Sequence, residues 1–479
     1  MTTAAARSIP VLDSTPMPSA RRLPLLGSLP FVLRDPLGFL SSTRHRGNVV
    51  ELDLGVGRIV LLHHADAARH VLRDQVRNYG KGGAMFRSFR KLLGDGLVTS
   101  QGELWRRQRQ MIQPQFHRRR LESTAGLMLD AIDEGLADWR RRLGSRDEGD
   151  SLDLRVELPR LTMKVIVRTM FGSGVEPTEA DRVTEALEYV QDAMLRGVLT
   201  DGLPAWLPVP GRRRFRDAVA TIDELVFRVI ERRRGASSGG VDSADARGDF
   251  VSLLLDAVDT ETGRGMDDRQ LRDEAVTMFS AGYETTATAL AWTFALLSRH
   301  RRELDLLRKE VDEVLGDRRP TFADLPSVAR ARRVVQESLR LYPPAWWIER
   351  KTAADDSVQG HHVAAGSSVV VLVHSIHRHP DLWQDPERFD SDRFLPAQTA
   401  GRHPLAWLPF GSGPRQCIGR EFSLMESQLA VIRVLQSFDL ECVDEPMPPV
   451  HVGATLKPKG PVRLRLTPRR TDGGVRRSE

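Results

Sequence analysis

The chain is poor in cysteine, with only Cys417 and Cys442 among its 479 residues. Two cysteines cannot build the disulfide network of a small secreted fold, so we interpret Cys442 as a spare thiol in a reducing compartment. Long apolar runs are also lacking. The longest uncharged apolar stretch, residues 285–298, is shorter than the roughly 20 residues that cross a bilayer, and is typical of a buried helix.

A strong excess of one charge is absent as well, because 70 Lys and Arg residues stand against 64 Asp and Glu residues. The basic residues are spread along the chain, which argues against nucleic-acid binding. Residues 1–22 contain no apolar core of signal-peptide length and no membrane anchor, so we expect a cytoplasmic location. With 41% hydrophobic and 28% charged residues, the chain can bury a sizeable core.

Cys417 lies in a glycine-rich turn, residues 410–420, directly before a predicted helix. From Gly419 onward, apolar residues recur three to five positions apart, as on one face of a helix. The unpaired N–H groups and the dipole at a helix N-terminus favour an anion, and a metal-bound thiolate is one. Cys417 could therefore ligate iron. The alternative is a buried free cysteine.

This turn resembles the haem-binding loop of the cytochromes P450, whose pattern is Phe-x-x-Gly-x-Arg-x-Cys-x-Gly. The pattern is filled by Phe410, Gly413, Arg415, Cys417 and Gly419. The glycines, Gly411 among them, let the backbone pass close under a flat macrocycle. Arg415 can pair with a haem propionate, and Phe410 can pack on the sulfur side. The resemblance implies haem b, iron protoporphyrin IX, with a thiolate ligand that favours O–O cleavage.

Two other segments resemble propionate contacts of the same family. Trp105 and Arg109 lie four positions apart on one face of a predicted helix, and both side chains can donate to a carboxylate. In the family, a Trp-x-x-x-Arg at this place holds a propionate, and Arg378 resembles a further contact. The alternative for the pair is a core tryptophan beside a solvated arginine.

A long helix opened by a variant capping box is predicted over residues 267–300. Its middle matches the oxygen-activation motif of the resembling family at Ala281, Gly282, Glu284 and Thr285. A glycine and an acid–alcohol pair are locally unfavourable there, which indicates a functional site rather than mere structure. Thr285 can bond a carbonyl one turn back and open the helix for water or dioxygen. The alternative is an ordinary helix with a surface glutamate.

Glu337 and Arg340 lie three apart at the end of another predicted helix. Alone, this spacing usually gives a surface ion pair. In the resembling family it is a buried structural pair joined by a second arginine downstream. We predict that this arginine is Arg393 rather than Arg388.

The substrate pocket is implied by resemblance alone. The helices on either side of the Pro-rich break at residues 201–211 would form a lid, although an apolar helix stripe is more often plain core. A C-terminal hairpin tip should enter the same site. The candidate pocket residues are Met194, Leu195, Leu199, Trp206, Leu207, Ala345, Trp346 and Ala454.

The resemblance implies a mainly α fold, the helical triangular prism of the cytochromes P450 with a small β region. A single domain over residues 23–468 would lie between disordered segments at 1–22 and 469–479. Within it, residues 49–63 are predicted to form a β-hairpin. The implied activity is that of a monomeric haem-thiolate monooxygenase, which uses dioxygen to hydroxylate or epoxidise a terpenoid, polyketide or fatty acid.

No flavin or ferredoxin domain follows residue 467, so we expect electrons to come from a ferredoxin and its reductase. Their expected docking surface contains Arg106, Arg107, Arg118 and Arg420, and is equally compatible with a merely solvated face. One alternative function is a peroxide-driven peroxygenase, although such enzymes in this family typically lack the acid–alcohol pair. The other is a non-enzymatic haem sensor.

Overall fold

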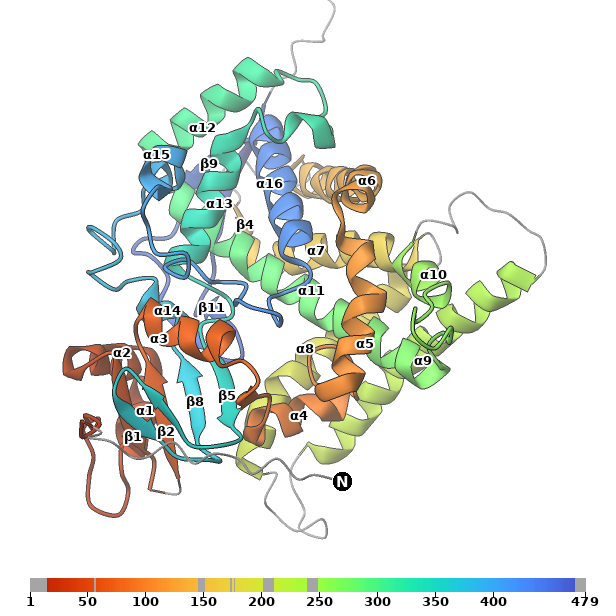
Figure 1. Ribbon diagram of the computed structural model, residues 1–479. Helices are drawn as coiled ribbons and strands as arrows, with labels where there is room; N and C mark the ends of the chain where they lie inside the picture. The colour runs from red at the N-terminus through yellow and green to blue at the C-terminus, as the bar shows by residue number, and fades with distance from the viewer. Residues whose placement is uncertain are drawn as a thin grey trace, which may run out of the picture. The chain divides into compact units, whose positions relative to one another are not determined.

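The computed structural model describes residues 15–55, 57–144, 151–172, 175, 177–200, 211–238 and 249–469. The chain divides into two compact units (Figure 1). Unit 1 contains residues 1–83, 347–386 and 403–416, and unit 2 contains residues 84–346, 387–402 and 417–479. Trp206 and Leu207 lie outside the described residues, as do the side chains of Leu195 and Leu199.

Unit 1 is built on a five-stranded sheet in the order β1-β2-β8-β5-β3. The predicted hairpin is confirmed, since β1 and β2 pair in antiparallel register with Val50 opposite Leu61. β2 then pairs in parallel with β8, which in turn runs antiparallel to β5. The strands of this sheet are β1 (Val49–Asp53), β2 (Arg58–Leu62), β3 (Tyr79–Gly80), β5 (Ile348–Thr352) and β8 (Ser368–Val371).

Residues before Leu23 already contact the sheet of unit 1. Ala20 is buried, and its backbone N–H donates to the Glu51 carbonyl at 2.8 Å, because this segment runs beside the edge strand β1. The other α-helices and strands of the unit are α1 (Leu29–Arg34), α2 (Pro36–Ser42), α3 (Ala65–Arg69), β6 (Asp356–Val358), β7 (His361–Val363) and α14 (Val373–Ile376).

Unit 2 is mainly helical (Figure 1). Its helices are α4 (Gly83–Leu93), α5 (Gly102–Ile112), α6 (Arg118–Gly144), α7 (Leu154–Phe171), α8 (Pro177–Thr200), α9 (Arg212–Ser238), α10 (Phe250–Leu255), α11 (Asp268–Leu297), α12 (Arg301–Val314), α13 (Ala329–Leu341), α15 (Pro396–Thr399) and α16 (Arg420–Ser437).

α11 is the central helix of unit 2. Its N-cap Asp267 accepts from the Gln270 backbone N–H at 2.8 Å, so the predicted cap and helix are confirmed. α7, α9, α13 and α16 all pack against it, and Figure 1 shows it running between them. Residues 271–280 and 286–297 are buried without a break. These two stretches are buried on every side, as expected at the centre of a large core.

The β structure of unit 2 lies in two small sheets. β4 (Ser151–Asp153), β12 (Arg463–Pro468) and β9 (Phe438–Cys442) form one, and β10 (Val450–Val452) and β11 (Leu456–Pro458) form the predicted hairpin. The Trp292 indole N–H of α11 donates to the Leu456 carbonyl at 2.7 Å, which fixes this hairpin on the central helix. Arg469, where a disordered tail was expected to begin, is held by ion pairing with Asp312 at 3.0 Å.

A buried ion network lies at the end of α13. The Arg340 guanidinium donates to both oxygens of Glu337, at 2.7 and 2.8 Å, and both side chains are fully buried. Arg393 Nε lies 3.3 Å from Glu337 Oε1. Arg388, in contrast, is 58% exposed and faces Asp390. Burial raises the pKa of Glu337, and the neighbouring arginines oppose this shift. The structure therefore brings Glu337, Arg340 and Arg393 together.

We expect Arg393→Met to lower the free energy of unfolding by about 3 kcal/mol. This is the lower end of the range for breaking a buried pair, because Arg340 keeps both of its bonds to Glu337. The exposed Arg388→Met is the matched control and should stay within about 0.5 kcal/mol of the parent. Urea unfolding followed by circular dichroism measures both. Equal losses in the two variants would contradict the assignment.

Candidate active site

The middle of α11 has a face that other elements do not cover. Within residues 271–297, all of which the structure describes, it is the only such face. Ala281 is exposed, Gly282 and Thr285 are half-buried, and the other residues of this segment are buried. Positions 281, 282 and 285 share one side of the helix. The result is a surface of small side chains within buried surroundings, against which a flat group can lie.

The Thr285 hydroxyl donates to the Ala281 carbonyl one turn back, at 2.7 Å, as the sequence predicts. The expected opening of the helix does not occur, because α11 remains α-helical from Asp268 to Leu297. Gly282 has a packing role that the sequence did not reveal. A Cβ added there would lie 2.7 Å from Ile166 Cδ1 on α7, so the glycine also allows the two helices to approach closely.

Glu284 is buried, so the alternative of a surface glutamate is wrong. Its Oε1 accepts from the Thr455 hydroxyl at 2.9 Å and lies 2.6 Å from Lys457 Nζ. Thr455 and Lys457 both come from the β10–β11 hairpin. A buried carboxylate is tolerated when it is paired and hydrogen-bonded, and these two residues provide both interactions. No local pattern in the sequence indicates Lys457 as the partner of Glu284, because the two residues lie far apart along the chain.

Cys417 lies just before α16 in unit 2, as predicted, with Gly419 as the N-cap residue. The residue keeps an exposed surface. Burial of the sulfur raises the pKa of its thiol, while the Gly419 N–H and the charges of Arg109 and Arg420 lower it. Burial has the larger effect, so the net shift of the pKa is upward. The three opposing groups would stabilise the thiolate, the form that binds a metal.

Trp105 and Arg109 both lie on α5, as predicted. Burial lowers the pKa of Arg109, and the negative charge of the Cys417 thiolate raises it. Unit 2 therefore places this guanidinium within electrostatic reach of Cys417. Such a position suits a cation that neutralises a group bound at the sulfur.

The glycine turn before Cys417 belongs to unit 1. Gly411 and Gly413 have φ values of +68° and +74°, which other residues adopt at a cost. A Cβ on Gly413 would lie 2.0 Å from the Leu72 carbonyl oxygen, so the packing of unit 1 itself requires this glycine. Phe410 packs edge-on against Trp407, with ring centroids 6.0 Å apart.

Arg415 and Arg378 share unit 1 with a third cation that the sequence analysis missed. Burial lowers the pKa of Arg415 to about 10. Arg350, buried on β5, also has a pKa of about 10, because of its burial and the positive charge of Arg415. Two guanidinium groups this close repel each other, and an anion such as a propionate would relieve the repulsion. Arg350 could have been found from the sequence as a charged residue at an inward-facing position of a strand.

The structure brings together part of the predicted pocket. The Trp346 indole N–H donates to the Gly453 carbonyl at 3.1 Å, beside Ala454 at the hairpin tip. Ala345 next to it is exposed. Met194, in contrast, is 5% exposed within the core of unit 2, which favours plain core packing over substrate contact.

The predicted basic surface is less open to a partner than the sequence suggested. Each of its four arginines already contacts a neighbour, which suits the alternative of a solvated face. The contacts of Arg106, Arg107, Arg118 and Arg420 are, in order, Glu103, Gln270, the Phe322 ring and Glu421. In the described part of the chain, no helix combines the length and apolar character needed to cross a membrane.

Comparison with known proteins identifies the family of the chain. The family described as cytochrome P450 matches residues 17–465. Cyclooctat-9-en-7-ol 5-monooxygenase of Streptomyces melanosporofaciens is 38% identical over 422 residues, which cover 88% of each chain. Pentalenene oxygenase of Streptomyces avermitilis is 33% identical over 449 residues, which cover 93% of this chain and 96% of that protein.

Among solved structures, the haem domain of cytochrome P450DA aligns with a TM-score of 0.84 at 27% identity, covering 96% of this chain and 99% of that one. This similarity confirms the predicted mainly α fold with a small β region. The chain therefore belongs to the cytochrome P450 family and is a monooxygenase, an oxidoreductase with haem as its cofactor.

Proposed function

We propose that this enzyme hydroxylates a cyclic terpenoid, with electrons from a separate ferredoxin and its reductase. The observation that carries the proposal is similarity over about nine-tenths of the chain to two enzymes named for cyclooctat-9-en-7-ol and pentalenene. Of the three substrate classes that the sequence leaves open, this similarity favours terpenoids over polyketides and fatty acids.

Each unit contains residues of the kinds that hold a haem in this family. Cys417 of unit 2 would be the iron ligand. Burial raises the pKa of its thiol, and the Gly419 N–H and the charges of Arg109 and Arg420 oppose this shift. When bound, the haem supplies the redox chemistry that activates dioxygen. Gly411, Gly413 and Gly419 would permit close backbone approach, and Phe410 would pack on the sulfur side. Arg109, Arg378 and Arg415, to which we add Arg350, would neutralise the propionates, and the Trp105 indole N–H would donate a hydrogen bond to one of them.

On α11, Ala281 and Gly282 form the uncovered face, and Thr285 directs the proton chemistry. The Thr285 hydroxyl is held by the Ala281 carbonyl and can position a water molecule on this face. Glu284 provides a fixed negative charge next to it along the helix. Lys457 and Thr455 hold that carboxylate in one orientation. The acid–alcohol pair argues against the peroxygenase alternative, and an oxygen-activating helix is not needed by a haem sensor.

The substrate side fits an apolar molecule. Trp346 is buried beside the hairpin tip, and its indole N–H is bonded to Gly453. Ala345 and Ala454 are small, and neither adds a charge. Apolar walls with few polar groups are typical of sites that bind hydrocarbons.

Titration of the ferric enzyme with pentalenene, dodecanoic acid and a macrolide tests the substrate class. We expect the terpene to shift the Soret band towards the high-spin position at the lowest concentration. Tighter binding of dodecanoic acid would contradict the terpenoid assignment.

A second experiment distinguishes a monooxygenase from a peroxygenase. It compares the product formed with ferredoxin and reductase with the product formed with hydrogen peroxide alone.

We expect Thr285→Ala to bind substrate and consume reducing equivalents, while more of the electrons end as hydrogen peroxide and fewer as product. The hydroxyl that positions the proton-donating water is lost, and such groups contribute about a hundredfold or more. Thr286→Ala is the matched control, because its hydroxyl contacts Ser423 on α16 and is buried. Product per NADPH is the readout. A normal ratio in Thr285→Ala would leave Thr285 with only a structural part in α11.

We expect Lys457→Met to lower product per NADPH severalfold, less than Thr285→Ala does, with substrate affinity kept. The substitution keeps the length of the side chain but leaves the buried Glu284 without its counter-ion. Lys459→Met, at an exposed position just after β11, is the control and should behave as the parent. The reduced carbon monoxide spectrum reports whether the thiolate ligand is intact in each variant. Equal coupling in the two lysine variants would mean that Lys457 does not position Glu284.

A further inference from the structure

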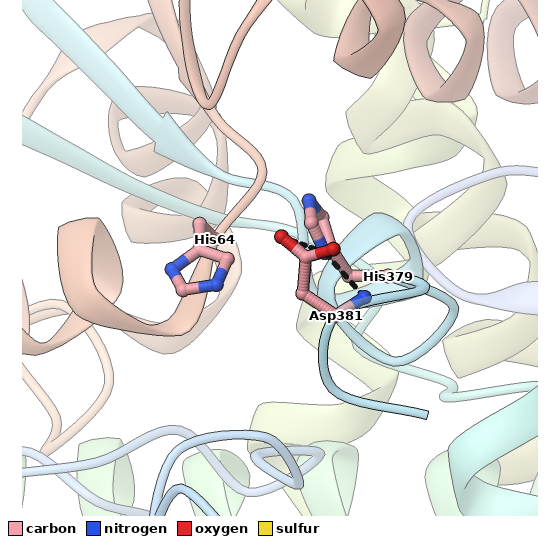
Figure 2. A group of neighbouring side chains, drawn as sticks. All are labelled: His64, His379 and Asp381. Carbon is pink, nitrogen blue, oxygen red and sulfur yellow. Dashed lines mark hydrogen bonds and ion pairs between the residues drawn. The ribbon is translucent and has the colours of Figure 1, made fainter. Parts of the chain in front are cut away.

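His64, His379 and Asp381 form a cluster in unit 1 that the monooxygenase reaction does not use. One ligand atom from each residue lies within 4.8 Å of the other two. His64 precedes α3, and the other two follow α14. Figure 2 shows the His64 ring on one side, with His379 and Asp381 together on the other. The two rings stand edge to face, with centroids 4.9 Å apart.

We propose that this cluster binds a divalent transition-metal ion of the zinc class. Two imidazoles and one carboxylate are a ligand set that zinc and its neighbours prefer, whereas calcium and magnesium prefer oxygen ligands alone. A bound ion would join the start of α3 to the segment after α14, two parts of unit 1 that are distant along the chain.

The geometry is close to that of a bound site. Ligands about 2.1 Å from a tetrahedral ion stand about 3.4 Å from one another, so closure requires movements of about an ångström. The Asp381 side chain is 72% exposed and can make this movement. The His379 side chain is 8% exposed, so it serves as the fixed ligand.

The charges around the cluster act in both directions. Arg44 lies close enough to affect His379, and its charge opposes a cation. Asp381 in the cluster and Asp66 beside it offset this charge.

Asp66 lies beside the cluster and adds a negative charge to it. Its carboxylate lies 3.2 Å from His64 Nδ1 and 3.2 Å from His403 Nε2. Its backbone N–H donates to His64 Nδ1 at 3.3 Å, which holds the His64 ring at the start of α3. Without an ion, the same contacts would be a plain hydrogen-bonded cluster, and the experiment below distinguishes the two.

Calorimetric titration of zinc chloride into tag-free, haem-loaded protein tests the site. All variants carry Cys442→Ser, so that this thiol cannot bind the ion. We expect saturable binding at a single site in the parent. Asp381→Asn and His64→Gln should each weaken it at least about tenfold, and Asp66→Asn about tenfold.

Asp355 and His362 offer a matched control, since they form an exposed Asp–His pair at 3.7 Å in the same unit. Asp355→Asn and His362→Gln should bind zinc as the parent does. Zinc-edge X-ray absorption should show nitrogen and oxygen ligands with imidazole scattering. Sulfur ligation, no saturable binding in the parent, or equal affinity in the cluster and control variants would overturn the proposal. None of these readouts depends on catalytic activity or on the substrate.

Discussion

The burial of α11 is the constraint on which unit 2 depends. Because helices surround it, polar groups on its middle turns must find partners inside the protein. Thr162 on α7 donates to the Tyr283 carbonyl at 3.0 Å, and Thr286 contacts Ser423 on α16 at 3.2 Å. The face formed by Ala281, Gly282 and Thr285 is left uncovered, so it is there that this helix can meet a ligand.

Glu284 extends the same constraint to the β10–β11 hairpin. A buried carboxylate needs a counter-ion, and the hairpin supplies it through Lys457. The hairpin is also tied to α11 through Trp292, and Trp346 bonds to its tip. The β10–β11 hairpin therefore contacts both Glu284, which we propose acts in proton transfer, and Trp346 of the proposed substrate pocket. A substrate that displaced the hairpin would disturb the position of Glu284.

The sequence predicted those parts of the site whose residues are close along the chain. The helix after Cys417, the long α11 and the Thr285 hydrogen bond follow from local spacing and helix geometry. The spacing of Glu337 and Arg340 predicts an ion pair, but its burial came from the family resemblance. The partnership of Glu284 with Lys457 and the closeness of Arg350 to Arg415 are long-range contacts, which no local pattern specifies. The sequence predicted Gly282 only as a functional residue. Its second role, which is to leave room for Ile166, depends on the packing of α7 against α11 and could not be predicted.

The histidine cluster of unit 1 is another long-range contact that no local sequence pattern predicts. Its residues come from two segments that the sheet brings together, since β2 leads to His64 and β8 leads to α14 and then to His379. β2 and β8 are parallel neighbours, with Leu62 opposite Val371, so their C-terminal ends meet at one edge. Side chains that follow parallel strands gather at such an edge whatever their separation in sequence. The pairing of these two strands, rather than any motif, therefore explains why two histidines and an aspartate meet there.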